Sequence, residues 1–115
     1  MKHNNDFRHD LEVGRLGEKA LDSILSNQKI EVKTDLLASK TGNVFVEYES
    51  RSKPSGISTT EADWWAFVIA KNQIVLLRTS RVKELSRKYW SRRIKGGDSN
   101  TSMGVLVPIK DLLGL

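Results

Sequence analysis

The sequence predicts one α/β (α+β) domain in which helices flank a central mixed β-sheet. Segments with helical hydrophobic periodicity and segments typical of strands follow each other in the order α-β-β-α-β-β-α-β. The chain has 115 residues, of which 38% are hydrophobic, and this suits a single core of modest size. No internal repeat interrupts this order, so we expect one sheet and its helices to share one core.

The first half of the chain is predicted to hold one helix and two strands. We expect residues 1–10 to form a polar N-terminal arm and residues 11–115 to form the single domain. Helical spacing over residues 11–25 puts four apolar side chains on one side, namely Leu11, Leu21, Ile24 and Leu25. Strict alternation predicts strands over residues 29–35 and 43–49.

The second half begins with a predicted short helix at Ser58, where Glu61 completes a capping box. Ser80 is a suitable N-cap for a longer helix. The other predicted elements are a hairpin of strands 65–70 and 74–77, a helix over 80–94, a strand over 105–107 and a helical turn over 109–113.

Composition excludes several classes of function. The chain has no cysteine, which excludes disulfides, thiolate metal ligands and a thiol nucleophile. Its two histidines, His3 and His9, both fall in the predicted arm. The longest apolar run, residues 64–70, is too short to span a bilayer, and the polar N-terminus lacks a signal-peptide pattern. We therefore expect a cytoplasmic protein with no membrane partner.

Basic residues concentrate in the second half of the chain. The net charge is +5, and the stretch from residue 71 to residue 95 contains a single acid, Glu84. Such a segment favours a nucleic-acid partner over a merely solvated helix face. The candidate phosphate contacts on this segment are Arg81, Arg87, Lys88, Arg92 and Arg93, and further candidates earlier in the chain are Arg51, Lys53 and Ser55.

Four carboxylates occupy positions that suggest chemistry: Glu18, Asp35, Glu47 and Glu49. Glu18 lies at the edge of the apolar helix stripe, and Asp35 ends the first strand. Glu47 and Glu49 are expected on one face of the second strand, roughly 7 Å apart. If the two strands are antiparallel neighbours, Asp35 approaches Glu47. Oxygen ligands without histidine or cysteine select Mg²⁺ or Mn²⁺, which support phosphodiester hydrolysis.

These residues resemble the motif of the PD-(D/E)XK nuclease superfamily, in particular its small phage-type and Holliday-junction-resolvase-like members. The matching segments are Glu18 in GRLGEKAL, Asp35 in IEVKTD, and Glu47-Tyr48-Glu49 in VFVEYES. The resemblance covers residues 11–79. It implies a restriction-endonuclease-like core and a Mg²⁺-dependent endonuclease acting on DNA, with the Asp35 and Glu47 carboxylates and the Tyr48 carbonyl as metal ligands.

The chain departs from the superfamily pattern in three ways. Glu49 stands where the motif has lysine, so Glu49, Lys33 and Lys53 all stay candidates for the role of that lysine. Lys33 is favoured, because residues two positions apart in a strand share a face and Lys33 therefore lies beside Asp35. Thr34 replaces the motif proline. No strand is evident before residue 29.

Other interpretations stay open beside the nuclease. The chain can be a non-catalytic nucleic-acid-binding module on the same fold, or a small protein whose basic helix binds an acidic partner protein. Glu47 and Glu49 can instead pair with Lys29 and Lys33 across the solvent-exposed face of an edge hairpin. Duplex, junction, flap and single-stranded DNA all stay open as substrates, and a compact cysteine-free nuclease would suit a phage in a bacterial host.

A homodimer is expected because cutting both strands of a duplex needs two sites in a fixed relation. Trp90 and Ile94, four residues apart on the predicted basic helix, would form an apolar strip near the interface or the DNA.

Overall fold

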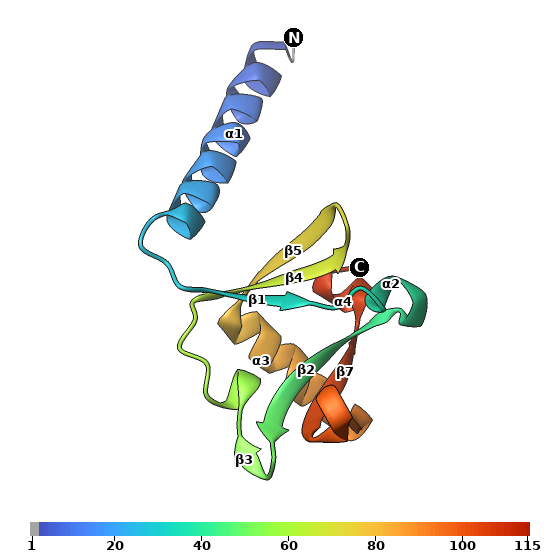
Figure 1. The fold of residues 1–115 in the computed structure, drawn as a ribbon. Coiled ribbons are helices and arrows are strands. Elements are labelled where there is room, and N and C mark those ends of the chain that lie inside the picture. Colours follow the sequence, from blue (N-terminus) through green and yellow to red (C-terminus); the bar gives the residue numbers. More distant parts are fainter. Residues whose placement is uncertain (1–2) are drawn as a thin grey trace.

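Two β-sheets and their short helices form a body from which one long helix projects (Figure 1). The computed structural model describes the backbone of residues 3–115 and the side chains of residues 7–97 and 99–115. The helices are α1 (His3–Leu25), α2 (Ala38–Thr41), α3 (Thr79–Lys88) and α4 (Ile109–Leu112), with the 3₁₀ turns η1 (Gly56–Ser58), η2 (Trp90–Arg92) and η3 (Asp98–Asn100). None of the described helices is both long and apolar enough to cross a lipid bilayer.

The strands divide into a mixed sheet and an antiparallel sheet. Their bounds are β1 (Ile30–Thr34), β2 (Asn43–Ser50), β3 (Lys53–Pro54), β4 (Trp64–Ala70), β5 (Gln73–Arg78), β6 (Arg93–Gly96) and β7 (Ser102–Pro108). The first sheet has the order β1-β4-β5, with β1 parallel to β4, and the second has the order β3-β2-β7-β6. The predicted α/β class with a mixed sheet and flanking helices is confirmed. The expectation of one central sheet is wrong, because the strands divide into two sheets that pack on a shared core.

The expectation that the first two predicted strands are antiparallel neighbours is wrong. β1 pairs with β4, in a register that aligns Ile30 with Trp64, whereas β2 pairs with β7. The beginning of β4 is clamped to β1, because the Lys29 carbonyl accepts hydrogen bonds from the backbone of Asp63 and Trp64. The Asp63 carboxylate in turn accepts one from the Lys29 N–H at 2.9 Å. No strand precedes β1 within residues 3–29.

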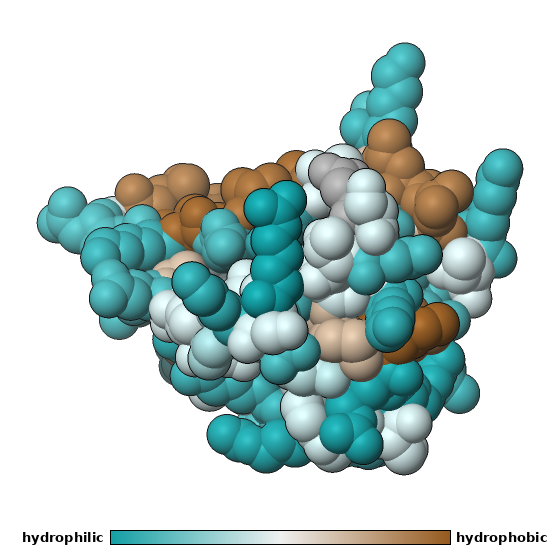
Figure 2. Space-filling view, turned by 60° about the horizontal axis from the view of Figure 1, so that its bottom comes forward, coloured by the Kyte–Doolittle hydropathy of each residue, from teal (hydrophilic) through white to brown (hydrophobic). Residues whose placement is uncertain are grey.

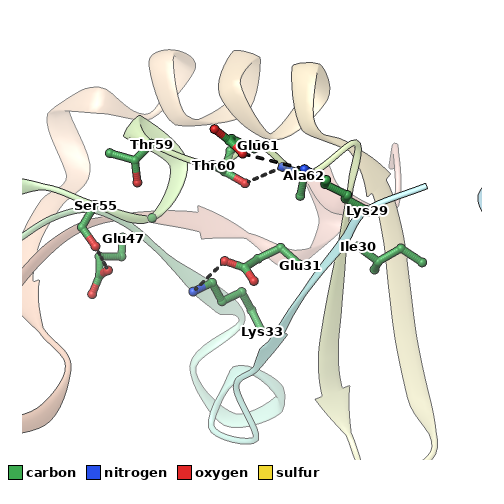
Figure 3. A pocket seen from close by; sticks show the side chains of 11 residues that line it. Lys29, Ile30, Glu31, Lys33, Glu47, Ser55, Thr59, Thr60, Glu61 and Ala62 are labelled. Carbon is green, nitrogen blue, oxygen red and sulfur yellow. Dashed lines mark hydrogen bonds and ion pairs between the residues drawn. The ribbon is translucent and has the colours of Figure 1, made fainter. Parts of the chain in front are cut away.

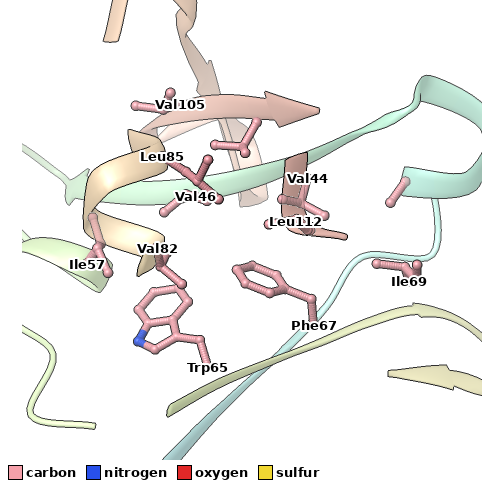
Figure 4. Close-up of a cluster of buried hydrophobic side chains, with 12 residues drawn as sticks. Val44, Val46, Ile57, Trp65, Phe67, Ile69, Val82, Leu85, Val105 and Leu112 are labelled. Carbon is pink, nitrogen blue, oxygen red and sulfur yellow. The ribbon is translucent and has the colours of Figure 1, made fainter. Parts of the chain in front are cut away.

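The hydrophobic core lies between the two sheets and α3 (Figure 4). β4 directs Trp65 and Phe67 into it, and both are fully buried. The other fully buried large side chains come from β2, β7 and α3: Val44, Val46, Val105, Val107, Val82 and Leu85. The predicted strands 43–49, 65–70 and 105–107 therefore supply this core through alternate side chains.

The predicted N-terminal helix and the predicted helix at Ser58 both differ from the structure. α1 begins at His3, inside the predicted polar arm, and its stripe is not buried, since Leu11 and Leu25 are exposed. η1 replaces the capped helix at Ser58, whose hydroxyl donates to the Tyr48 carbonyl instead. Residues 1 and 2 of the predicted arm lie outside the described residues.

The basic helix ends at Lys88 rather than at residue 94. The Tyr89 hydroxyl donates a hydrogen bond to the Asp111 carboxylate, and the chain then turns through η2 into β6. Trp90 consequently packs against Tyr48 in a tilted arrangement, with ring centroids 4.7 Å apart, while Ile94 lies on β6. The two side chains therefore do not form the helical strip that the sequence predicted.

We predict that Gly56→Ala destabilises the fold more than Gly42→Ala. Both glycines have positive φ, 55° and 75°, so both alanines carry the left-handed penalty of roughly 1–2 kcal/mol. A Cβ on Gly56 would also lie 2.2 Å from the Glu47 carbonyl oxygen, whereas one on Gly42 meets open space. This overlap adds about 1–3 kcal/mol. Urea unfolding measures the difference, and equal losses would contradict the close approach.

Candidate functional site

A polar cavity of about 460 Å³ lies between β1, β2 and the loop that contains η1 (Figure 3). Hydroxyl side chains from the loop, Ser55, Thr59 and Thr60, line one side of it. The charged residues that line it are Lys29, Glu31, Lys33, Glu47 and Glu61. Both strands therefore direct charged side chains into the space between them.

β1 exposes its apolar side chains and turns its charged side chains inward, which is the reverse of an ordinary surface strand. Its apolar residues Ile30 and Val32 are exposed, whereas Glu31 and Lys33 are half-buried and point into the cavity (Figure 3). The Lys33 ammonium lies 3.6 Å from the Glu31 carboxylate and 5.5 Å from the Trp65 ring centroid. The cation is thus held over a core aromatic ring at the inner side of the strand.

Glu47 is fixed by two serine hydroxyls. Ser55 donates to its Oε2 and Ser102 to its Oε1, each at 2.6 Å. Partial burial raises the pKa of Glu47, but the hydrogen bonds from Ser102 and Ser55 and the charge of Lys33 outweigh it, so the pKa lies below its usual value. Glu47 is therefore held ionised and in one orientation.

Asp35 joins Glu47 and Lys33 around a smaller adjoining cavity of about 190 Å³. Its carboxylate accepts a hydrogen bond from the Phe45 N–H at 3.3 Å, and its own N–H donates to the Val68 carbonyl at 2.9 Å. Asp35 thereby links the mixed sheet to β2 of the antiparallel sheet. Asp35 and Glu47 line this cavity together, although β1 and β2 are not paired.

Glu47 and Glu49 were expected on one face of β2, but they lie on opposite faces. A β-bulge shifts the register so that Glu47 opposes Gly104 and Glu49 opposes the adjacent Met103. Since neighbours along β7 face opposite sides, the two glutamates do as well. Glu49 lines neither of the cavities that Glu47 lines.

The candidates for the motif-lysine role are also separated. Lys53 is exposed on β3, at the far end of the β2–β3 hairpin. Of Lys33, Lys53 and Glu49, all within the described residues, Lys33 alone lines both cavities with Glu47. The alternative pairing of Glu47 and Glu49 with Lys29 and Lys33 is absent among the described ion pairs, because Lys33 pairs with Glu31 and Lys29 with Glu61, at 3.8 Å.

The Tyr48 carbonyl is engaged in the hairpin rather than at the cavity. It accepts hydrogen bonds from the Ser55 N–H at 3.1 Å and from the Ser58 hydroxyl at 2.7 Å. These two bonds use both lone pairs of the oxygen, so its predicted role as a metal ligand does not fit this arrangement.

Glu18 stands away from the cavities. It is exposed on α1, in a surface hollow shared with Arg15, Lys19 and Asp22. The predicted buried stripe would have carried Glu18 toward the sheet, but α1 projects from the body instead (Figure 1).

The predicted phosphate contacts differ in how freely their charges are available. Arg81 pairs with Glu84 at 3.0 Å, and Lys88 lies 3.4 Å from Asp111. Arg92 donates to the Asn43 side chain at 3.0 Å. Arg51 and Lys53 are exposed at the β2–β3 turn. Arg87 lines a hollow beside Tyr48 and Trp90, and Arg93 lies over the Trp90 ring. Ser55 binds Glu47.

Sequence reasoning missed Ser102 and Glu31 as parts of the site. Ser102 is buried on β7 and meets Glu47 across the antiparallel sheet. Its partner lies 55 positions away in the chain, and no local pattern identifies such a pair. Glu31 could have been found, because it shares the face of its strand with Lys33.

Two carboxylates, those of Asp35 and Glu47, line the same small cavity. No three His, Asp or Glu side chains among those described lie close enough to form a complete metal site. Mg²⁺, however, commonly takes one or two carboxylates and completes its shell with water and phosphate oxygens. Asp35 and Glu47 are the two carboxylates that could hold such a cation, and Glu47 keeps free lone pairs beside its two serine bonds.

We predict that Ser102→Ala raises the pKa of Glu47, because it removes a hydrogen bond that stabilises the carboxylate. A depressed folded-state pKa adds stability above the usual glutamate value, and that stability is lost as the pH falls through the folded pKa. The variant should therefore lose about 1.5–3 kcal/mol at neutral pH and less in acid. NMR titration of the Glu47 carboxyl and urea unfolding measure the two effects.

Ser86→Ala is the matched control, since Ser86 is equally buried but donates to the Val82 carbonyl inside α3. A Glu47 titration that is unchanged in Ser102→Ala would contradict the assigned hydrogen bond.

Comparisons with protein-family models, curated proteins and solved structures found no match.

Proposed function

We propose that the protein is a metal-dependent endodeoxyribonuclease that hydrolyses phosphodiester bonds, as its resemblance to the PD-(D/E)XK nucleases implies. The observation that carries the proposal is the meeting of Asp35, Glu47 and Lys33 at one cavity, with Glu47 held ionised by two serines. The two carboxylates suit a cation, and the ammonium group suits the phosphate that the cation accompanies.

In this proposal Asp35 and Glu47 hold Mg²⁺ or Mn²⁺. The bound cation would supply Lewis-acid polarisation of the phosphate and neutralise the charge that develops on it. Ser55 and Ser102 keep Glu47 ionised and oriented for that task. Lys33 faces the same space and can donate hydrogen bonds to a phosphate oxygen or to the attacking water. The attacking water gives up a proton to solvent as its oxygen bonds to phosphorus, the bond to the leaving sugar oxygen breaks, and that oxygen takes up a proton from solvent.

The basic residues would guide the DNA backbone. Arg51 and Lys53 lie at the exposed hairpin turn that continues from β2, the strand of Glu47. Arg87 and Arg93 flank Tyr48 and Trp90, where aromatic rings and cations suit a nucleotide. The proposed setting is the cytoplasm of a bacterial cell, with a phage as a suitable source.

A non-catalytic nucleic-acid-binding module is the second candidate. The bulge that turns Glu49 away from Glu47, and the lack of a third carboxylate beside the pair among the described residues, favour it.

We predict that Asp35→Asn and Glu47→Gln each abolish cleavage, since each removes one of the two anionic ligands. Lys33→Met should lower the rate by about 10²–10³, the range typical of losing one hydrogen-bond donor to the charge that develops on the phosphate. Glu49→Gln is the matched control and should keep cleavage, since Glu49 lines neither cavity. Plasmid, four-way junction and single-stranded DNA, incubated with Mg²⁺, Mn²⁺ or chelator, provide the assay.

Cleavage that persists in Asp35→Asn or in chelator would contradict the nuclease mechanism. DNA binding by the unaltered chain without cleavage in any metal would select the non-catalytic module.

We also predict that the pair Arg87→Gln and Arg93→Gln weakens DNA binding at all sequences. Each lost phosphate contact should flatten the slope of log affinity against log salt by about one unit. The pair Arg81→Gln and Lys88→Gln should change the slope less, because carboxylates already compensate these charges. Fluorescence anisotropy at several salt concentrations measures the slopes, and equal effects of the two pairs would place the DNA elsewhere.

A further inference from the structure

α1 carries an apolar face that the body of its own chain does not cover. Helical spacing brings Phe7, Leu11, Leu21 and Leu25 to one side, and all four are exposed. Gly14 and Gly17 lie near the same side, where an added Cβ would meet nothing within 4 Å. Glycine weakens a helix, so two of them on this side are better explained by a close-packed neighbour than by an isolated helix.

The mixed sheet has a matching uncovered face. Residues at alternate positions of its three strands point away from the core, and β-sheet register aligns them into one surface. The exposed apolar members are Ile30, Val32, Ile74 and Leu76. Hydrophobic side chains also gather along the upper edge of the surface in Figure 2, above a face that is mostly hydrophilic.

The polar groups on the two faces are complementary. The sheet face carries one cation, Arg78, whose guanidinium lies 4.6 Å from the Trp64 ring centroid. The indole N–H of Trp64 is buried and has no acceptor among the described residues. On α1 the acid Glu18 lies within the apolar face and the acids Asp10 and Asp22 lie at its two edges, while the cations Arg15 and Lys19 lie further round the helix. A helix packed on this sheet would therefore bring carboxylates to a cation and an unsatisfied donor.

The connection between α1 and β1 directs the helix away from its own sheet. Lys29 is clamped to β4 by hydrogen bonds on both its N–H and its carbonyl, which leaves residues 26–28 as the link. Asn27 takes a left-handed conformation there, with φ 53°. The helix consequently projects from the body (Figure 1), and the molecule extends 61 Å along its longest axis. Val32 on β1 is 59% exposed.

We propose that α1 of each chain docks on the outer face of the β1-β4-β5 sheet of a second copy, in a reciprocal homodimer. When two chains exchange this helix, the apolar face of each α1 is buried against the sheet of the other chain. The resulting dimer has two-fold symmetry and leaves no further copy of either face uncovered. The interface lies on the face of β1 opposite to Glu31 and Lys33, so it leaves the cavity of Glu47 open. The inference is independent of the proposed nuclease activity, and it assigns the interface to α1 rather than to Trp90.

Light scattering of two aspartate variants tests the interface. The unaltered chain should have about twice the 13.0 kDa mass of one chain. Leu21→Asp should return it to 13.0 kDa, whereas Leu16→Asp should stay dimeric, because helical spacing places residue 16 on the opposite side of α1. Both leucines are exposed in the single chain, 54% and 67%, so neither change affects the core. A mass of 13.0 kDa for the unaltered chain, or equal effects of both changes, would overturn the proposal.

Disulfide trapping distinguishes exchange from folding back of α1 onto its own sheet, and the cysteine-free chain suits it. A mixture of Leu21→Cys and Val32→Cys chains should give a covalent dimer under mild oxidation, and a mixture of Leu16→Cys and Val32→Cys chains should not. In the double variant Leu21→Cys and Val32→Cys, a disulfide confined to one chain would overturn the proposal in favour of folding back.

Discussion

The parallel pairing of β1 with β4 is the constraint on which the other features of this protein depend. β4 supplies Trp65 and Phe67 to the core, and the clamp between Lys29 and Asp63 fixes β1 beside it in a single register. Because side chains alternate along a strand, that register turns Glu31 and Lys33 inward and Ile30 and Val32 outward. A shift by one residue would reverse both faces. One backbone pairing thus determines both the charged cavity and the uncovered apolar surface.

The electrostatics of the cavity follow from that arrangement. Glu47 comes from the other sheet, where Gly56 allows the loop of Ser55 to pass close over its backbone. Two hydroxyl donors and a neighbouring ammonium offset the cost of partial burial, so the carboxylate stays charged. Asp35 reaches the same place through its bond to the Phe45 N–H. The site therefore exists only while both sheets hold their positions, which makes it sensitive to changes at their junction.

The sequence was sufficient for the features that depend on local patterns. Alternation located the strands of Asp35 and Glu47, and residue parity selected Lys33. Features set by distant contacts were not accessible in this way. The strand partner of β1, the bulge after Glu47 and the hydrogen bond from Ser102 all depend on which strands meet, and hydrophobic period alone does not encode that. The stripe on α1 was identified correctly as apolar, but periodicity shows that a helix has such a face without showing what covers it.

Calorimetric titration with Mn²⁺ tests the central claim, that Asp35 and Glu47 together form a cation site. The unaltered chain should bind Mn²⁺ with measurable heat, and Asp35→Asn should lose that binding because one carboxylate alone is a weak ligand. Glu49→Gln should bind as the unaltered chain does, since the bulge turns Glu49 to the other face of the sheet. Equal Mn²⁺ affinity in the unaltered chain and in Asp35→Asn would contradict the site.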